Sequence, residues 1–281
     1  MKFVLGMPRS GTTFISHLLN LVGPVSIHEH LLSLTGFQIL ASAKEFSEGR
    51  KTAEQIRHLL RCYDLRPEVT IDSNYILVHV LPALLREYPD GSFIHLTRDP
   101  RDNIRSCVNQ LDLYGDFFEK QKAQEGLIRW FVKQNRPWLY PIVKAIHESS
   151  PKINLKDWEQ LGQLEKNCIY WTESHKKIIA TLSGGKNYLQ VRIEDLKKDR
   201  KAVLNIFDFF ELPRAKEEKL NMLLNQTVNA SSEPMWAEFT RIKKENGIPI
   251  LSPFNERSTA DQNILIKHCG ETARNLGYYL I

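Results

Sequence analysis

The stretch "KFVLGMPRSGTTF", residues 2–14, decides the fold class. Its first part, "KFVLG" (2–6), is a short apolar run that stops at a glycine, as a buried β-strand does. The following "TTFISHLLNLV" (12–22) carries apolar residues at helical spacing until it meets Gly23-Pro24. A strand, a glycine-containing loop and a helix in that order form the phosphate-binding unit of many parallel α/β proteins.

The loop between this strand and this helix has the chemistry of an oxygen-anion site. The N-terminus of a helix offers unpaired N–H groups and a partial positive charge. The candidate ligands around it are Arg9, Ser10, Gly11, Thr12 and Thr13. A plain capped helix after a tight turn is the alternative, but a guanidinium beside three hydroxyls favours an anion. The ATP-binding pattern GxxxxGK[ST] is not matched, because Thr12 stands where its lysine would be.

The composition predicts a globular protein with a single domain over residues 1–281, since 42% of the residues are hydrophobic. The net charge of +5 suits an ordinary basic protein or one with an anionic ligand. No run of 18 apolar residues occurs and the N-terminus does not resemble a signal peptide, so we expect neither a membrane span nor a secretory leader. Four scattered cysteines indicate free thiols in the cytoplasm: Cys62, Cys107, Cys168 and Cys269.

Strand-like and helix-like segments alternate along the rest of the chain. This alternation predicts a three-layer α/β/α fold with a mostly parallel central sheet, of the P-loop nucleotide-binding type. Further strands are expected within 25–30, at 92–98 and at 187–193. Helices are expected at 33–65, from Tyr75 to a break near Pro82 and beyond, at about 100–113, across 115–185, after Arg200 and at 260–276.

A second anion site is predicted in "FIHLTRDPRDNIRS" (93–106). Arg98 ends a predicted strand, at the edge where ligands bind in open α/β sheets. Ser106 follows eight residues later in the next helix. Arg101 and Arg105 are more simply read as a solvated helix face. A ligand with two separate anionic groups would use both predicted sites.

At this point the chain resembles the sulfotransferases that use 3′-phosphoadenosine 5′-phosphosulfate (PAPS). "PRSGTTF" (8–14) resembles the loop that binds the 5′-phosphosulfate, and "RDPRDNIRS" (98–106) resembles the 3′-phosphate motif. "YLQVRIEDLKKDRKAVLNIFDFFELP" (188–213) and "NILIKHCGETARNLGYYL" (263–280) resemble the later strand–helix unit and the closing helix. The arginine in the loop is similar to that of the tyrosylprotein and bacterial branches.

The resemblance implies a sulfuryl transfer from PAPS, with adenosine 3′,5′-bisphosphate (PAP) as product and no metal. Arg9 is expected to stabilise the transition state. Glu29, in "SIHEHLL" (26–32), is expected to be the general base, with His30 as its nearest rival and His79 as a third candidate. His95, inside a predicted strand, is expected to be buried and structural.

The resemblance is incomplete at three places. Ile193 replaces a frequent tyrosine. Phe14 stands where cytosolic members carry an adenine-stacking tryptophan, and it is expected to be among the cofactor-binding residues. The C-terminal phosphate clamp has no clean match, although Arg257 or the basic run 241–244 can replace it.

The expected acceptor is a small molecule, glycan, lipid or peptide, and no nucleic-acid partner is expected. A divergent P-loop phosphotransferase and a catalytically inactive nucleotide-binding module are the alternative functions.

Overall fold

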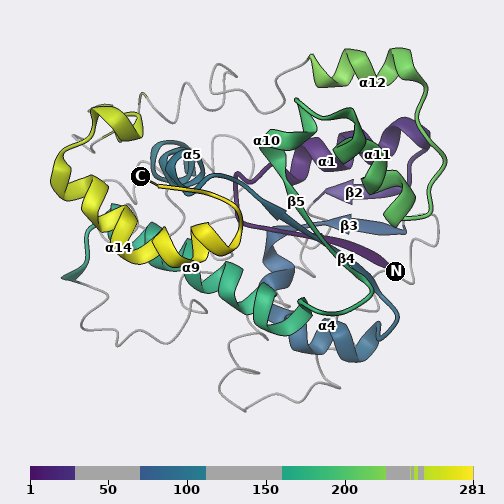
Figure 1. Ribbon diagram of the computed structural model, residues 1–281, viewed down its shortest axis with the longest axis horizontal. Helices are drawn as coiled ribbons and strands as arrows, with labels where there is room; N and C mark the ends of the chain where they lie inside the picture. Colours follow the sequence, from purple (N-terminus) through teal and green to yellow (C-terminus); the bar gives the residue numbers. More distant parts are fainter. Residues whose placement is uncertain (29–69, 112–159, 226–240, 242–243, 246–249, 281) are drawn as a thin grey trace. The chain divides into compact units, whose positions relative to one another are not determined.

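The computed structural model describes residues 1–28, 70–111, 160–225, 241, 244–245 and 250–280 (Figure 1). By their internal contacts the residues form two compact units. The first unit comprises Met1–Arg98 and Lys177–Asn229, and the second comprises Asp99–Lys176 and Ala230–Ile281. Whether the chain is one functional domain, as the sequence predicts, stays a prediction.

The first unit is built on a five-stranded parallel sheet with the order β2-β3-β1-β4-β5. Three of the strand predictions are confirmed within a few residues, and the first strand is confirmed almost as expected. The strands are β1 (Lys2–Leu5), β2 (Ser26–His28), β3 (Ile71–Ser73), β4 (Ser92–Thr97) and β5 (Tyr188–Arg192).

One strand, β3, was not predicted. It is only three residues long, and two of the three residues in its sequence "IDS" are polar. Such a sequence is not typical of a buried strand. Its place is nevertheless central, because it pairs with β1 on one side and with β2 on the other. The registers place Ile71 beside Lys2 and Ser73 beside Val4.

Helices cover both faces of this sheet, which confirms the predicted three-layer α/β/α arrangement. Figure 1 shows α1 and α11 on one side of the strands and α4 on the other. The helices of the first unit are α1 (Thr12–Leu19), α4 (Leu81–Glu87), α10 (Ile193–Leu196), α11 (Arg200–Phe209) and α12 (Glu217–Leu224). Short 3₁₀ segments occupy Asn20–Val22 and Tyr75–Val80.

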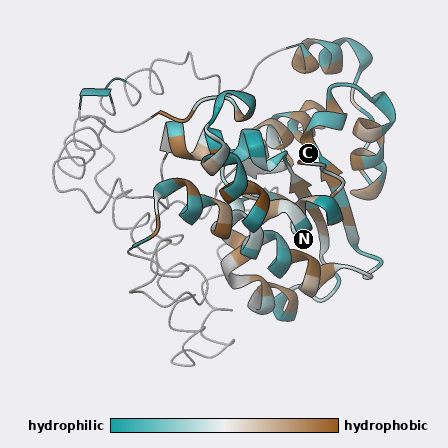
Figure 2. Cartoon of the chain, turned by 60° about the vertical axis from the view of Figure 1, so that its left-hand side comes forward, coloured by the Kyte–Doolittle hydropathy of each residue, from teal (hydrophilic) through white to brown (hydrophobic). Residues whose placement is uncertain are grey.

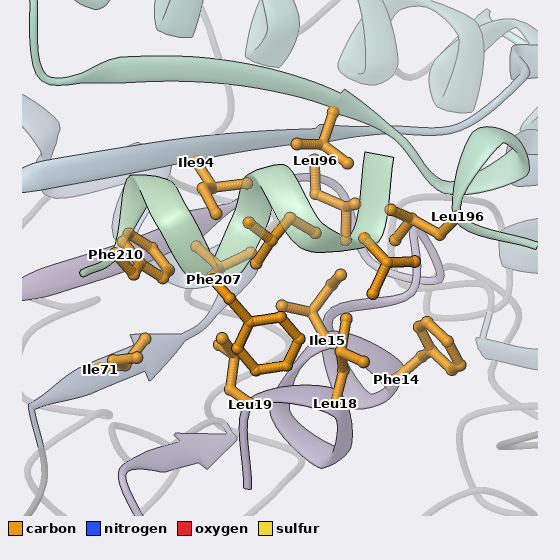
Figure 3. Close-up of a cluster of buried hydrophobic side chains, with 14 of the residues drawn as sticks. Phe14, Ile15, Leu18, Leu19, Ile71, Ile94, Leu96, Leu196, Phe207 and Phe210 are labelled. Atoms are coloured by element: carbon orange, nitrogen blue, oxygen red, sulfur yellow. The ribbon is translucent and has the colours of Figure 1, made fainter. Parts of the chain in front are cut away.

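Alternate residues of each strand contribute to the two faces of the sheet, because successive side chains in a strand point to opposite sides. Phe3 and Leu5 of β1 pack with residues of α4, the 3₁₀ segment before it and the Leu182 end of α9 (Gln163–Leu182). Val4 faces the other cluster, in which side chains of α1 and α11 meet (Figure 3). Figure 2 shows hydrophobic colour along the strands and both colours on the helices, as an amphipathic covering layer requires.

The second unit is helical in its described part. It contains α5 (Pro100–Ser106), the π-helical turn Cys107–Leu111, the first part of α9, a 3₁₀ turn at Phe254–Glu256 and α14 (Thr259–Asn275). Ser258 caps α14 by accepting a hydrogen bond from the Asp261 N–H, which confirms the predicted start of the last helix.

Contacts between α9 and α14 hold the second unit together. The His268 ring lies 2.6 Å from the Glu165 carboxylate, and the Thr172 hydroxyl donates to the His268 carbonyl at 2.8 Å. The thiols of Cys168 and Cys269 are buried between these contacts. Cys107 is buried as well and forms no disulfide with the other described cysteines, while Cys62 lies outside the described residues.

Candidate functional site

The loop between β1 and α1 lies at the carboxyl edge of the sheet, at the point where the order of the strands reverses. β1 has β3 on one side and β4 on the other, so the segments that follow these neighbouring strands approach the same edge. In open α/β sheets ligands bind at such a switch point. The sequence-predicted anion loop therefore occupies the position that the fold favours for a ligand.

The backbone of this loop is left-handed at two positions. Arg9 has φ of 64° and Gly11, which caps α1, has φ of 103°. Positive φ is uncommon for a residue with a side chain and ordinary for glycine. Backbones that alternate hand in this way turn successive N–H groups toward one point and form anion-binding concavities.

Both glycines of the loop are required by close contacts. A Cβ on Gly6 would lie 2.6 Å from the Ser10 hydroxyl oxygen and 2.8 Å from the Leu96 carbonyl. A Cβ on Gly11 would lie 2.7 Å from a methyl group of Ile193. The isoleucine that replaces the family's tyrosine thus packs against the loop backbone.

Ser10 is buried with no exposed surface, and its hydroxyl oxygen has no hydrogen-bond partner among the residues that the structure describes. A buried hydroxyl without a partner costs about 1–3 kcal/mol relative to a satisfied one. Its N–H donates to the Met7 carbonyl at 3.1 Å, which closes a tight turn inside the loop. The unsatisfied hydroxyl fits a loop that receives an oxygen anion.

Two side chains from neighbouring strands hold the carbonyl groups of this segment. The Ser73 hydroxyl, at the end of β3, donates to the Thr12 carbonyl at 2.7 Å. The Arg98 guanidinium, directly after β4, donates through Nη1 to the Arg9 carbonyl at 2.8 Å. Ser73 was not predicted as a site residue, and the polar end of the run "TIDSN" (70–74) is the only feature of the sequence that marks it.

The remaining predicted loop residues differ in exposure. Thr12 is buried at the start of α1, whereas Thr13 is half-buried. Phe14 is 7% exposed and packs in the hydrophobic cluster with Ile15 and Leu18 of the same helix (Figure 3). Its predicted contact with a base stays a prediction.

In the second unit, α5 carries the other half of the predicted 3′-phosphate motif. The Asp99 carboxylate caps this helix by accepting from the Arg101 N–H at 2.8 Å, and Pro100 fills the first helical position. The same carboxylate pairs with the Arg101 side chain at 2.6 Å. Arg105 lies 3.3 Å from Asp102, and Ser106 is the half-buried last residue of the helix.

Arg257 is a buried cation of the second unit, with 7% of its surface exposed. It donates to the Ser252 carbonyl at 2.8 Å and to the Arg101 carbonyl at 3.1 Å, and it lies over the Phe254 ring. Within the described part of the chain, its Nη1 has no hydrogen-bond partner. Burial is the largest influence on this guanidinium and lowers its pKa. A buried guanidinium with a free nitrogen is suited to an anionic ligand.

His95 is buried in β4, as the sequence predicts. Its Nδ1 lies 2.8 Å from the Tyr188 hydroxyl of β5. Burial lowers the pKa of His95 to about 3 and raises the pKa of Tyr188 to about 12, so both side chains are neutral at physiological pH.

The predicted base is not part of this geometry. Glu29 and His30 lie outside the described residues, and the side chain of His79 does too. Within the described ranges, no three His, Cys, Asp or Glu side chains gather as a metal site would require. Among the described helices, none has the length and apolar character to cross a membrane.

Comparison with known proteins agrees with the geometry. The sulfotransferase domain from the curacin biosynthetic pathway matches 100% of this chain and 98% of its own, with a TM-score of 0.51 and 16% identity. At that identity the likeness supports the α/β fold alone. No curated protein matches. The family model described as the sulfotransferase domain matches residues 2–251, nearly the whole chain. The chain therefore belongs to the sulfotransferase domain family, whose members transfer a sulfuryl group to an acceptor.

Proposed function

We propose that the protein transfers the sulfuryl group of PAPS to a hydroxyl or amine acceptor and releases PAP. The observation that carries the proposal is the loop after β1. Arg9 at positive φ, the unsatisfied buried hydroxyl of Ser10 and the N-terminus of α1 occur together there. These groups match the donors that a phosphosulfate needs, and the loop has no Walker-type lysine for an ATP tail.

PAPS supplies an activated sulfuryl group, and the chain supplies positive charge around it. Arg9 stabilises the charge that grows on the oxygens of the moving group, because a guanidinium donates to several oxygens at once. Loss of one such donor raises a barrier by roughly 2.7–4 kcal/mol. A sulfuryl group carries less negative charge than a phosphoryl group, so we propose that arginine and backbone N–H groups act without a metal. Gly11, Thr12 and Thr13 hold the 5′-phosphate.

The adenosine end is assigned to a different set of residues. Arg98 binds the 3′-phosphate and Ser106 contributes a hydroxyl, as their eight-residue spacing in the family motif suggests. Arg257 is proposed as the C-terminal phosphate contact, supported by its burial and by its Nη1 without a partner.

The general base is proposed to be Glu29. It is the only carboxylate between Met1 and Glu45, and in the sequence it directly follows the short strand β2. His30 and His79 are the rival candidates. The acceptor is a small molecule, glycan, lipid or peptide that carries the hydroxyl or amine.

The deciding experiment is titration calorimetry with PAP and with ATP, each with and without magnesium. We expect PAP to bind more tightly than ATP and to need no metal. ATP binding that is tighter, or that appears only with magnesium, would support the divergent phosphotransferase and contradict the proposal. A screen of acceptors with labelled PAPS, read by mass spectrometry, then identifies the acceptor class.

A further inference from the structure

Arg98 has a contact that a phosphate ligand alone does not require. Its Nη1 donates to the carbonyl of Arg9 at 2.8 Å, across 89 positions of the chain. This bond is made within the first unit, from the residue after β4 to the loop after β1. The two strands are neighbours in the sheet, so their ends approach each other.

The bond acts on the most constrained part of the loop. Arg9 has φ of 64°, a conformation that a residue with a Cβ rarely adopts without support. The peptide group between Arg9 and Ser10 is held at both ends, because its carbonyl accepts from Arg98 and its N–H donates to the Met7 carbonyl. Arg98 therefore stabilises the loop backbone before any ligand arrives.

We propose that Arg98 is a positioning residue for the 5′-phosphosulfate loop in addition to a ligand of the 3′-phosphate. A guanidinium has five N–H donors, so one can hold the Arg9 carbonyl while others bind an anion. Binding of the 3′-phosphate end of PAPS is then coupled to binding of its phosphosulfate end. The reason is that Arg98 binds the 3′-phosphate and also holds the loop that receives the phosphosulfate. This inference rests on the proposed function.

The coupling predicts an effect on a ligand that has no 3′-phosphate. If Arg98 only binds the 3′-phosphate, replacing it leaves the affinity for adenosine 5′-phosphate unchanged. If it also positions the loop, the same replacement weakens adenosine 5′-phosphate as well. We expect Arg98→Ala to raise the Kd of adenosine 5′-phosphate about five- to tenfold and to raise the Kd of PAP by more.

The experiment measures the Kd of PAP and of adenosine 5′-phosphate for the wild type, Arg98→Ala, Arg98→Lys and Arg86→Ala. Arg86 is an exposed cation of α4 in the same unit, so its replacement controls for net charge and should leave both Kd values unchanged. Arg98→Lys keeps the charge without the planar fork, and we expect weakened adenosine 5′-phosphate binding. The Arg98→Lys variant also tests the positioning role if the Arg98→Ala variant does not fold.

The outcomes separate the two proposals. If adenosine 5′-phosphate binds equally well to the wild type and both Arg98 variants, the positioning role is wrong, even where PAP remains the better ligand of the wild type. If Arg98→Lys restores wild-type affinity for adenosine 5′-phosphate, charge alone explains the effect and the positioning role is again wrong. If the wild type does not prefer PAP to adenosine 5′-phosphate, the proposed function itself fails.

Discussion

The neutral, buried His95 makes the stability of the protein depend on pH in a way that can be calculated. Its pKa is about 3 in the folded protein, because burial opposes the charged ring, and 6.5 is its ordinary value. The unfolded chain therefore binds a proton at this residue below pH 6.5, whereas the folded chain does not until about pH 3. Stability is fully present above pH 6.5 and is lost as the pH falls below it.

The loss can be worked out for a practical range. Between pH 7.5 and pH 5.0 the difference in pKa removes about 2 kcal/mol from the free energy of unfolding. Other groups titrate in the same range, so the quantity to compare is the change with pH in two proteins. We expect His95→Asn to lose about 2 kcal/mol less than the wild type over this range. Asparagine places a polar atom near the position of Nδ1 but does not titrate.

Urea unfolding followed by circular dichroism at the two pH values gives these free energies. His17→Asn is the matched control, because it makes the same substitution at a histidine that is exposed on α1. Histidine NMR of the wild type provides an independent readout, in which the His95 ring does not titrate between pH 8 and pH 5. Equal losses in the wild type and in His95→Asn would refute the reasoning.

Two substitutions and one labelling experiment also test the site and the core. Gly11→Ala should abolish PAP binding and lower the free energy of unfolding by about 1–3 kcal/mol, because the new Cβ would clash with Ile193 and because φ is 103° at this position. Calorimetry measures the affinity and urea unfolding measures the stability. A normal affinity for PAP would contradict the loop geometry. Glu29→Gln should lower the sulfation rate roughly 10²–10⁴-fold with little change in the Kd of PAP, and full turnover would remove Glu29 as the base. Cys168 and Cys269 should react with an aromatic disulfide reagent only after unfolding, because both are buried and burial raises the pKa of Cys168; peptide mass spectrometry on the labelled native protein tests this, and rapid labelling of either would contradict the packing.

The sequence predicted the parts of the fold that are long or strongly patterned. The strand at 92–98 and the last helix were recognisable because apolar residues recur at the spacing of their own element. β3 was not, because three residues with an aspartate and a serine carry no such pattern. Whether a polar strand lies at the centre of a sheet depends on its neighbours, and its own sequence does not contain that information.

The site divides in the same way. The candidate ligands of the loop are contiguous, so an anion site could be proposed from residues 6–14 alone. The hydrogen bonds from Ser73 to Thr12 and from Arg98 to Arg9 join residues 61 and 89 positions apart. They follow from the order of the strands, which the sequence pattern left open. The sequence therefore predicted a set of candidate ligands, but it did not predict the hydrogen bonds that Ser73 and Arg98 make to the loop backbone.

The contacts that support the loop backbone also have a consequence for the order in which the protein is synthesised. The predicted anion loop precedes all of these supports in the chain, because they come from β3, from the residue after β4 and from Ile193 after β5. A nascent chain that ends before β5 has every predicted ligand residue of the loop but lacks Ile193, the side chain that packs on Gly11. The loop therefore gains its last support only after Ile193, which follows Gly11 by 182 positions, has been synthesised.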